Sequence, residues 1–258
     1  MIRSIILLLL LSPMLFANSS LKLFYFEDKQ GQHTIKSVQK IDFNQSLTSR
    51  FSLGYRPKNH VHWFAIDIDP YTKDKELMLY FTNLFAKDFT FYYQDSNGKW
   101  QKKETGYNES NRSKNIWTSK PTLEFNAKHN QRIYVKVESD VAIVGEFWLF
   151  DSLAKLIDYQ SHYYLFFALF YGVLLMAMGI ALFLFITLRE AIYGYFLGYL
   201  LFTGSFVFMV NSLHSPFATP QIVHTFRTLT PVTVIFYVLF AKELLEIKRV
   251  APRLNILF

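Results

Sequence analysis

The hydrophobic pattern of the chain changes its period near residue 151. Before that point, apolar and polar positions alternate in short runs separated by turn residues, which is the pattern of half-buried β-strands. Arg132–Glu138 is the clearest run, because Ile133, Val135 and Val137 fall on one face. Further strands are predicted at residues 21–26, 62–68, 76–81, 89–94, 99–104 and 146–150. We predict an all-β, jelly-roll-like antiparallel sandwich over residues 18–150, followed by an α-helical transmembrane bundle.

A hairpin turn is predicted at Asp95-Ser96-Asn97-Gly98, between two of these runs. Asn and Gly both tolerate positive φ, so Asn-Gly between apolar runs is a strong local hairpin signal.

The second half of the chain shows long apolar runs with almost no charge. Residues 163–188 carry no charged side chain over a length that exceeds the ~20 residues needed to cross a bilayer. Further spans are predicted at 191–210 and, with a kink at Pro231, at about 222–241. We therefore assign residues 162–258 to a membrane domain whose partner is the lipid bilayer.

The two parts are joined by a predicted helical connector, residues 151–161. Leu153, Leu156 and Ile157 lie on one helical face, and either Asp151 or Ser152 is available as the N-cap. The absence of Gly and Pro between Asp151 and Phe170 predicts a stiff connection.

The N-terminus has the parts of a secretory signal peptide, residues 1–17. Arg3 precedes the apolar residues 5–11, and Ala17 offers a small-residue cleavage site, although an uncleaved anchor helix is the alternative. Export of the N-terminal domain places Arg189 in the cytoplasm. The cluster of basic residues after the third apolar run then obeys the positive-inside rule: Lys242, Lys248, Arg249 and Arg253.

Charge and composition exclude several classes of function. Residues 22–158 contain 20 Lys and Arg against 17 Asp and Glu, so the two signs of charge are nearly balanced there. The net charge of +7 therefore does not indicate a basic face of the kind that binds nucleic acid. The absence of cysteine excludes disulfides, thiolate catalysis and Cys-based zinc sites.

No catalytic motif for a nucleophile, a phosphate loop or a metalloprotease occurs, and we predict neither an enzyme nor a cofactor. His60 and His62 share one face of a strand and would be metal ligands only with a third partner. Because alternation puts Asp67 on the opposite face, we predict no metal site.

Aromatic residues beside polar ones provide a candidate ligand site. Trp117 lies in a polar loop with Tyr107 and Arg112, and Trp100 follows the hairpin turn. An exposed aromatic ring beside hydrogen-bonding side chains suits a sugar or small polar ligand. The alternative is that Trp117 caps one end of the sandwich.

Small residues recur at helix-packing intervals within the apolar runs. Ala168 and Gly172 are four residues apart in the first run, and Gly194 and Gly198 form a GxxxG in the second. Packing inside one bundle is the first interpretation, and a homodimer face is the second.

Several stretches together resemble one family, the bacterial seven-transmembrane receptors with diverse intracellular signalling modules. HVHWFAIDID, FTFYYQDSNGKWQKKETG and IYVKVES resemble its second type of extracellular sensor domain, a jelly roll related to carbohydrate-binding modules. ALFYGVLLMAMGIALFLF and LREAIYGYFLGYLLF resemble its first two receptor helices. The family has seven helices and then an output module, whereas three helices are predicted here, so we expect a C-terminally truncated portion of such a receptor.

The resemblance implies a receptor in the bacterial inner membrane, with its N-terminal domain in the periplasm. That domain would sense a small molecule or carbohydrate and pass the signal through the helices to an output module outside these residues. The alternative is a membrane-anchored carbohydrate-binding or envelope-organising protein without signalling.

Overall fold

The computed structural model describes residues 21–43, 45–48, 50–54, 60–68, 75–82, 88–95, 97–106, 118, 120–127, 132–139, 142–211, 213 and 220–246, and only the backbone of residues 220–229. The chain forms two compact units, and the boundary between them falls between Gln160 and Ser161.

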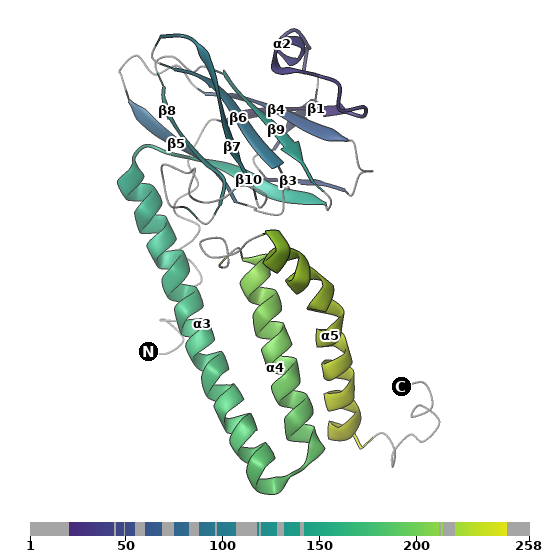
Figure 1. The fold of residues 1–258 in the computed structure, drawn as a ribbon. Helices are drawn as coiled ribbons and strands as arrows, with labels where there is room; N and C mark the ends of the chain where they lie inside the picture. The colour runs from purple at the N-terminus through teal and green to yellow at the C-terminus, as the bar shows by residue number, and fades with distance from the viewer. Residues whose placement is uncertain are drawn as a thin grey trace. The chain divides into compact units, whose positions relative to one another are not determined.

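The first unit is a β-sandwich of two antiparallel sheets (Figure 1). The six-stranded sheet has the order β2-β1-β4-β9-β6-β7, and the four-stranded sheet has the order β3-β10-β5-β8. The strands are β1 (Lys22–Asp28), β2 (Gln45–Leu47), β3 (Arg50–Leu53), β4 (Val61–Asp67), β5 (Glu76–Phe81), β6 (Asp88–Gln94), β7 (Trp100–Thr105), β8 (Thr122–Asn126), β9 (Arg132–Glu138) and β10 (Ile143–Phe150).

Each strand predicted from the sequence is present, and the predicted sandwich is confirmed. The sequence pattern missed β2, β3, β8 and the short helix α2 (Ile35–Val38). These elements have three to five residues each, too few for the hydrophobic period to stand out.

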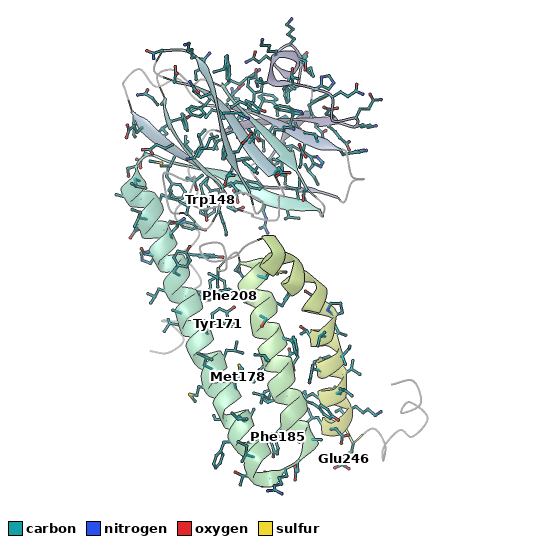
Figure 2. All side chains as sticks on the ribbon, viewed as in Figure 1. Trp148, Tyr171, Met178, Phe185, Phe208 and Glu246 are labelled. Atoms are coloured by element: carbon teal, nitrogen blue, oxygen red, sulfur yellow. The ribbon has the colours of Figure 1, made fainter. Side chains whose placement is uncertain are left out.

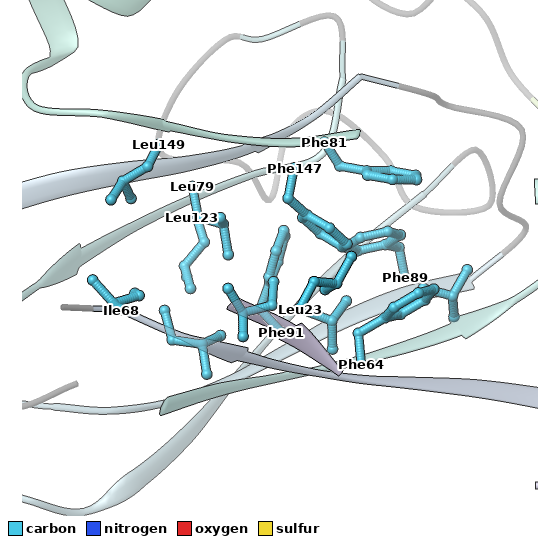
Figure 3. Close-up of a cluster of buried hydrophobic side chains, with 14 of the residues drawn as sticks. Leu23, Phe64, Ile68, Leu79, Phe81, Phe89, Phe91, Leu123, Phe147 and Leu149 are labelled. Atoms are coloured by element: carbon cyan, nitrogen blue, oxygen red, sulfur yellow. The ribbon is translucent and has the colours of Figure 1, made fainter. Parts of the chain in front are cut away.

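The main core lies between the two sheets and is dominated by phenylalanine (Figure 3). The centre of this core is Phe147 on β10, whose ring centroid lies 4.7 Å from that of Phe81 and 5.6 Å from that of Phe64. Phe51 and Phe89 complete the surrounding rings at 6.0 and 6.4 Å. Strand alternation explains this arrangement, because every second side chain of β4, β5, β6, β9 and β10 points inward.

A second cluster covers the outer face of the six-stranded sheet. Val38 of α2 and Phe43 pack over Trp63, Ala65 and Tyr134, and all five are buried. Trp63 is therefore a core residue, but it lies beneath α2 and not between the sheets.

The second unit contains three helices, with α4 between α3 and α5 (Figure 1). They are α3 (Leu153–Leu188), whose first eight residues belong to the sandwich unit, α4 (Ala191–Val210) and α5 (Pro220–Leu244), which contains Pro231. Among the described residues, α3 and α4 are long and apolar enough to cross a membrane. Few residues of these two apolar segments are buried within the protein, unlike those of a core helix in a soluble protein. The third span at 222–241 remains a prediction.

One buried cation, Lys120, lies immediately before β8. Its side chain is 7% exposed, and burial lowers its pKa to about 8. The hydroxyls of Thr118 and Thr122 both donate to its main-chain oxygen, at 2.7 and 3.0 Å, which fixes the backbone at this point.

Replacing Phe147 by Ala should lower the free energy of unfolding of the sandwich by about 3–5 kcal/mol, because it leaves a cavity among four rings. All four tryptophans of the chain precede residue 160, so tryptophan fluorescence during urea unfolding reports on this unit. Val144→Ala is the control on the same strand, since Val144 is 43% exposed, and should change stability by less than about 0.5 kcal/mol. Equal effects of the two substitutions would contradict the assignment of the core.

Replacing Lys120 by Met should change the pH dependence of the free energy of unfolding, because the variant has no group at this position whose pKa differs between the folded and unfolded chain. In the wild-type protein, stability should increase between pH 8 and pH 10, where the unfolded chain keeps a proton that the folded lysine has lost. The variant should lack this increase, and Lys99→Met, at an exposed turn, should retain it. Identical pH profiles for the wild type and Lys120→Met would show that the ammonium is not desolvated.

Candidate functional site

The hairpin between β6 and β7 fixes the position of Trp100. Oδ1 of Asp95 accepts hydrogen bonds from the backbone N–H groups of Asn97 and Lys99, both at 2.9 Å, and Gly98 has a φ of +72°. Gln101 donates to the other carboxylate oxygen, and these hydrogen bonds hold the pKa of Asp95 below its usual value. The predicted turn is thus confirmed, and it presents Trp100 at the start of β7.

Trp100 is the exposed member of a group of aromatic rings on the outer face of the six-stranded sheet, in which Tyr134 is buried and Tyr92 is partly buried. Its side chain is 40% exposed, and its ring centroid lies 5.8 Å from that of Tyr134 on β9. Tyr92 on β6 is the direct neighbour of Tyr134 in the sheet. We call Trp100, Tyr134 and Tyr92 the aromatic surface.

Buried rings support the aromatic surface from beside and beneath it. Tyr92 stacks on the fully buried Trp63, with centroids 5.7 Å apart, and Tyr134 contacts Phe43 at 6.2 Å. Packing therefore fixes the rotamers of these rings, so little side-chain entropy would be lost if a ligand bound to them.

The charged side chains around the aromatic surface occur in opposite-charge pairs. Lys102 contacts Glu104 at 2.7 Å, and Lys136 contacts Glu138 at 2.6 Å. Arg132 forms a two-point ion pair with Asp67, and this hydrogen bonding raises the pKa of the guanidinium. With these cations neutralised locally, the surface has little electrostatic attraction for an anion.

Trp100 is the one member of the predicted ligand site that the described residues contain. Tyr107, Arg112 and Trp117 lie outside them. Sequence reasoning overlooked Tyr92 and Tyr134. The available signal was that both occupy the outward positions of their strands, where polar side chains are expected on a free sheet face.

His60 and His62 both have protein partners. Nδ1 of His60 lies 2.8 Å from Oε1 of Glu27, and Nδ1 of His62 lies 2.9 Å from the hydroxyl of Tyr25. Both contacts join β1 to β4, and Asp67 lies on the opposite face, paired with Arg132. In the described part of the chain, no three His, Asp or Glu side chains are grouped in a way that could hold a metal ion.

The start of α3 is anchored on the outer face of the four-stranded sheet. Leu156 is completely buried there, and the ring of Tyr159 lies 4.9 Å from Trp148 and 5.7 Å from Phe150. Tyr80 closes the group at 5.9 Å from Tyr159. We call these residues, together with Met78, the helical anchor.

The helical face predicted for the connector is only partly correct. Leu156 is buried, but Leu153 and Ile157 are 39% and 52% exposed, because the helix turns Tyr159 toward the sheet instead. Of the two candidate N-caps, Ser152 accepts the hydrogen bond from the backbone N–H of Lys155. Asp151 instead bonds to Nζ of Lys155 at 2.7 Å, which keeps the pKa of Asp151 below its ordinary value.

Two of the four predicted packing residues line helix interfaces within the chain. A Cβ atom at Gly194 would lie 3.0 Å from the ring of Phe185 on α3, and one at Gly198 would lie 2.2 Å from Phe236 on α5. The GxxxG of α4 thus contacts neighbouring helices of the same chain. Ala168 is exposed, and a Cβ atom at Gly172 would meet no atom within 4 Å among the described residues.

Comparisons with known proteins cover both parts of the chain. Residues 21–150 match the family described as 7TMR-DISM extracellular 2, and residues 163–258 match the family described as 7TM diverse intracellular signalling. No curated protein sequence matches the chain.

Similar solved structures include TmCBM61 in complex with beta-1,4-galactotriose, which is 15% identical with a TM-score of 0.27 over 50% of this chain and 88% of that one. Another is chitosan-binding module 1 from a chitosanase/glucanase of Paenibacillus sp. IK-5. It is 14% identical, with a TM-score of 0.22 over 42% of this chain and 80% of the other.

The family matches agree with the architecture, since the first covers the sandwich and the second covers the apolar helices. The chain therefore belongs to the 7TMR-DISM family of membrane receptors, with an extracellular domain of the second type over residues 21–150 and a match to the family's membrane domain over residues 163–258.

Proposed function

We propose that the sandwich senses a ligand and passes the signal through α3 to an output module outside these residues. The observation that carries this proposal is the continuity of α3, whose first eight residues belong to the sandwich unit and whose remainder is a candidate membrane span. The proposal places the chain in a bacterial inner membrane with the sandwich in the periplasm. The predicted signal peptide and the basic residues after α5 support that orientation.

The helical anchor limits how α3 responds to binding. Detaching it from the sheet would expose Leu156 and Tyr159, at a cost of roughly 1.5–3 kcal/mol for each side chain. Converting a two-state equilibrium from 1:99 to 99:1 already takes about 5.5 kcal/mol of differential binding. Full detachment would cost most of the free energy that differential binding supplies. The signal is therefore a repacking of α3 on the sheet, with the helix still attached.

The aromatic surface favours an uncharged, hydroxyl-rich ligand, and we propose a carbohydrate. The exposed ring of Trp100, which packs beside Tyr134, would stack on the apolar face of a sugar, and the surrounding polar side chains would supply hydrogen bonds. The opposite-charge pairs around the rings disfavour an anionic small molecule.

The alternative proposal is a membrane-anchored carbohydrate-binding or envelope-organising protein without signalling. It uses the same aromatic surface, but it requires no mechanical coupling between the helical anchor and the membrane helices. The two proposals therefore differ in the response of α3 to ligand.

Replacing Trp100 by Ala should weaken carbohydrate binding by tenfold or more, the effect of truncating a central aromatic contact. The full chain in lipid nanodiscs is screened on a glycan array, and the affinity for the best saccharide is then measured by calorimetry. Val144→Ala, an exposed change on the four-stranded sheet, should bind as the wild type does. Equal affinity of wild type and Trp100→Ala would place the ligand elsewhere.

Inserting four glycines between Gln160 and Ser161 should abolish the response of the membrane helices to that saccharide without changing its affinity. Four alanines at the same point add about one helical turn, keep the helix stiff and should preserve a response. Because the chain has no cysteine, a fluorescent label on Leu188→Cys at the far end of α3 reports the change specifically. A full response in the glycine variant would rule out coupling through a stiff helix, and no response in any variant would favour the anchored binder.

A further inference from the structure

The contact between α3 and α4 includes two tyrosine hydroxyls of α3, which donate to main-chain oxygens of Gly204 in α4 and of Asn211 directly after it. The hydroxyl of Tyr171 lies 2.9 Å from the carbonyl oxygen of Gly204, and that of Tyr163 lies 2.8 Å from the carbonyl oxygen of Asn211. Figure 2 shows Tyr171 beside Phe208 in this interface, where their ring centroids are 6.0 Å apart.

The absence of a side chain at Gly204 makes room for the hydrogen bond from Tyr171. A Cβ atom at this position would lie 2.5 Å from Cδ2 of Leu174 and 3.9 Å from the ring of Tyr171. The missing side chain therefore leaves a socket on α4 that Leu174 and Tyr171 fill together.

The contact between α4 and α5 is of a different kind. Three pairs of rings connect the helices, Phe196 with Phe240, Tyr199 with Tyr237 and Phe202 with Phe236, at centroid distances of 5.0, 5.6 and 5.3 Å. Phe236 also lies directly against the backbone of Gly198. The backbones of α4 and α5 run close together, whereas those of α3 and α4 stay farther apart and are bridged by long side chains.

We propose that α4 and α5 form a rigid pair and that α3 moves against it, with the Tyr171–Gly204 hydrogen bond as the latch between two positions. This proposal rests on the role in signalling that is proposed above for α3. It adds that the interface between α3 and α4 changes, while the interface between α4 and α5 does not. A polar contact between membrane helices is individually weak, because the separated helices find other partners for their polar groups. Two such bonds are weaker than three packed ring pairs, so the contact between α3 and α4 is the one expected to change first.

The two hydroxyl bonds should open together. Tyr163 and Tyr171 are eight residues apart on α3, and their acceptors are seven residues apart on the antiparallel α4, so both spacings are close to two helical turns. An axial shift of α3 by one residue, about 1.5 Å, therefore displaces both hydroxyls from their acceptors at once.

Replacing Tyr171 by Phe tests the latch, because it removes one oxygen and keeps the ring. Spin labels on Met176→Cys and Leu201→Cys, both exposed, measure the distance between α3 and α4 in the full chain in nanodiscs. Leu201→Cys with Ile235→Cys measures the distance between α4 and α5. We expect the first distance to shift or broaden by about 1–2 Å and the second to stay unchanged.

Tyr164→Phe is the matched control, since it makes the same chemical change on the exposed side of the same helix and should leave both distances unchanged. Gly204→Ala, which fills the socket, should displace α3 as Tyr171→Phe does. If Gly204→Ala changed the distance between α3 and α4 and Tyr171→Phe did not, the contact would be purely steric and the latch would be overturned. Equal changes in the α3–α4 and α4–α5 distances would also overturn it. The distance measurement needs no ligand. A result that overturns the latch would therefore leave the proposed receptor function to be tested separately, by saccharide binding.

Discussion

The structure of the first unit depends on one packing constraint: two sheets must enclose a dry layer of phenylalanine rings without help from disulfides. Phe147 contacts rings contributed by β3, β4, β5 and β6, so a single side chain links both sheets. Strict alternation in each strand is what brings these rings inward. The same alternation directs Trp100, Tyr134 and Tyr92 outward, so the core and the candidate binding surface are two faces of the same strands.

Most of the fold could be predicted because its elements have strong, local signals. Arg132–Glu138 alternates without interruption, Asn97-Gly98 forms a hairpin turn, and residues 163–188 contain no charge. The second cluster on the outer sheet face could not be predicted in this way. Val38 and Phe43 belong to a short irregular segment, and only tertiary structure shows that they cover Trp63 and Tyr134.

The candidate site was harder to predict, for a physical reason. A ligand surface on a sheet combines side chains from strands that are distant in sequence, here β6, β7 and β9, and strand order is not encoded in any local period. Trp100 was selected because it follows a turn, whereas Tyr134 is brought beside it only by the crossover that inserts β9 between β4 and β6. For the connector, the helix could be predicted but its rotation could not, since propensity does not decide whether Ile157 or Tyr159 faces the sheet.

The length of α3 has a mechanical consequence. At 1.5 Å per residue, its 36 residues make a rod of about 54 Å, of which the helical anchor holds only the first 12 Å or so. The remaining arm of about 42 Å acts as a lever. A tilt of about 5° at the sandwich would displace the far end by roughly 4 Å, which is several times the shift that the tyrosine hydroxyl bonds tolerate. In the proposed signalling role, small rearrangements in a stiff β-sandwich would therefore produce a large displacement at the far end of α3.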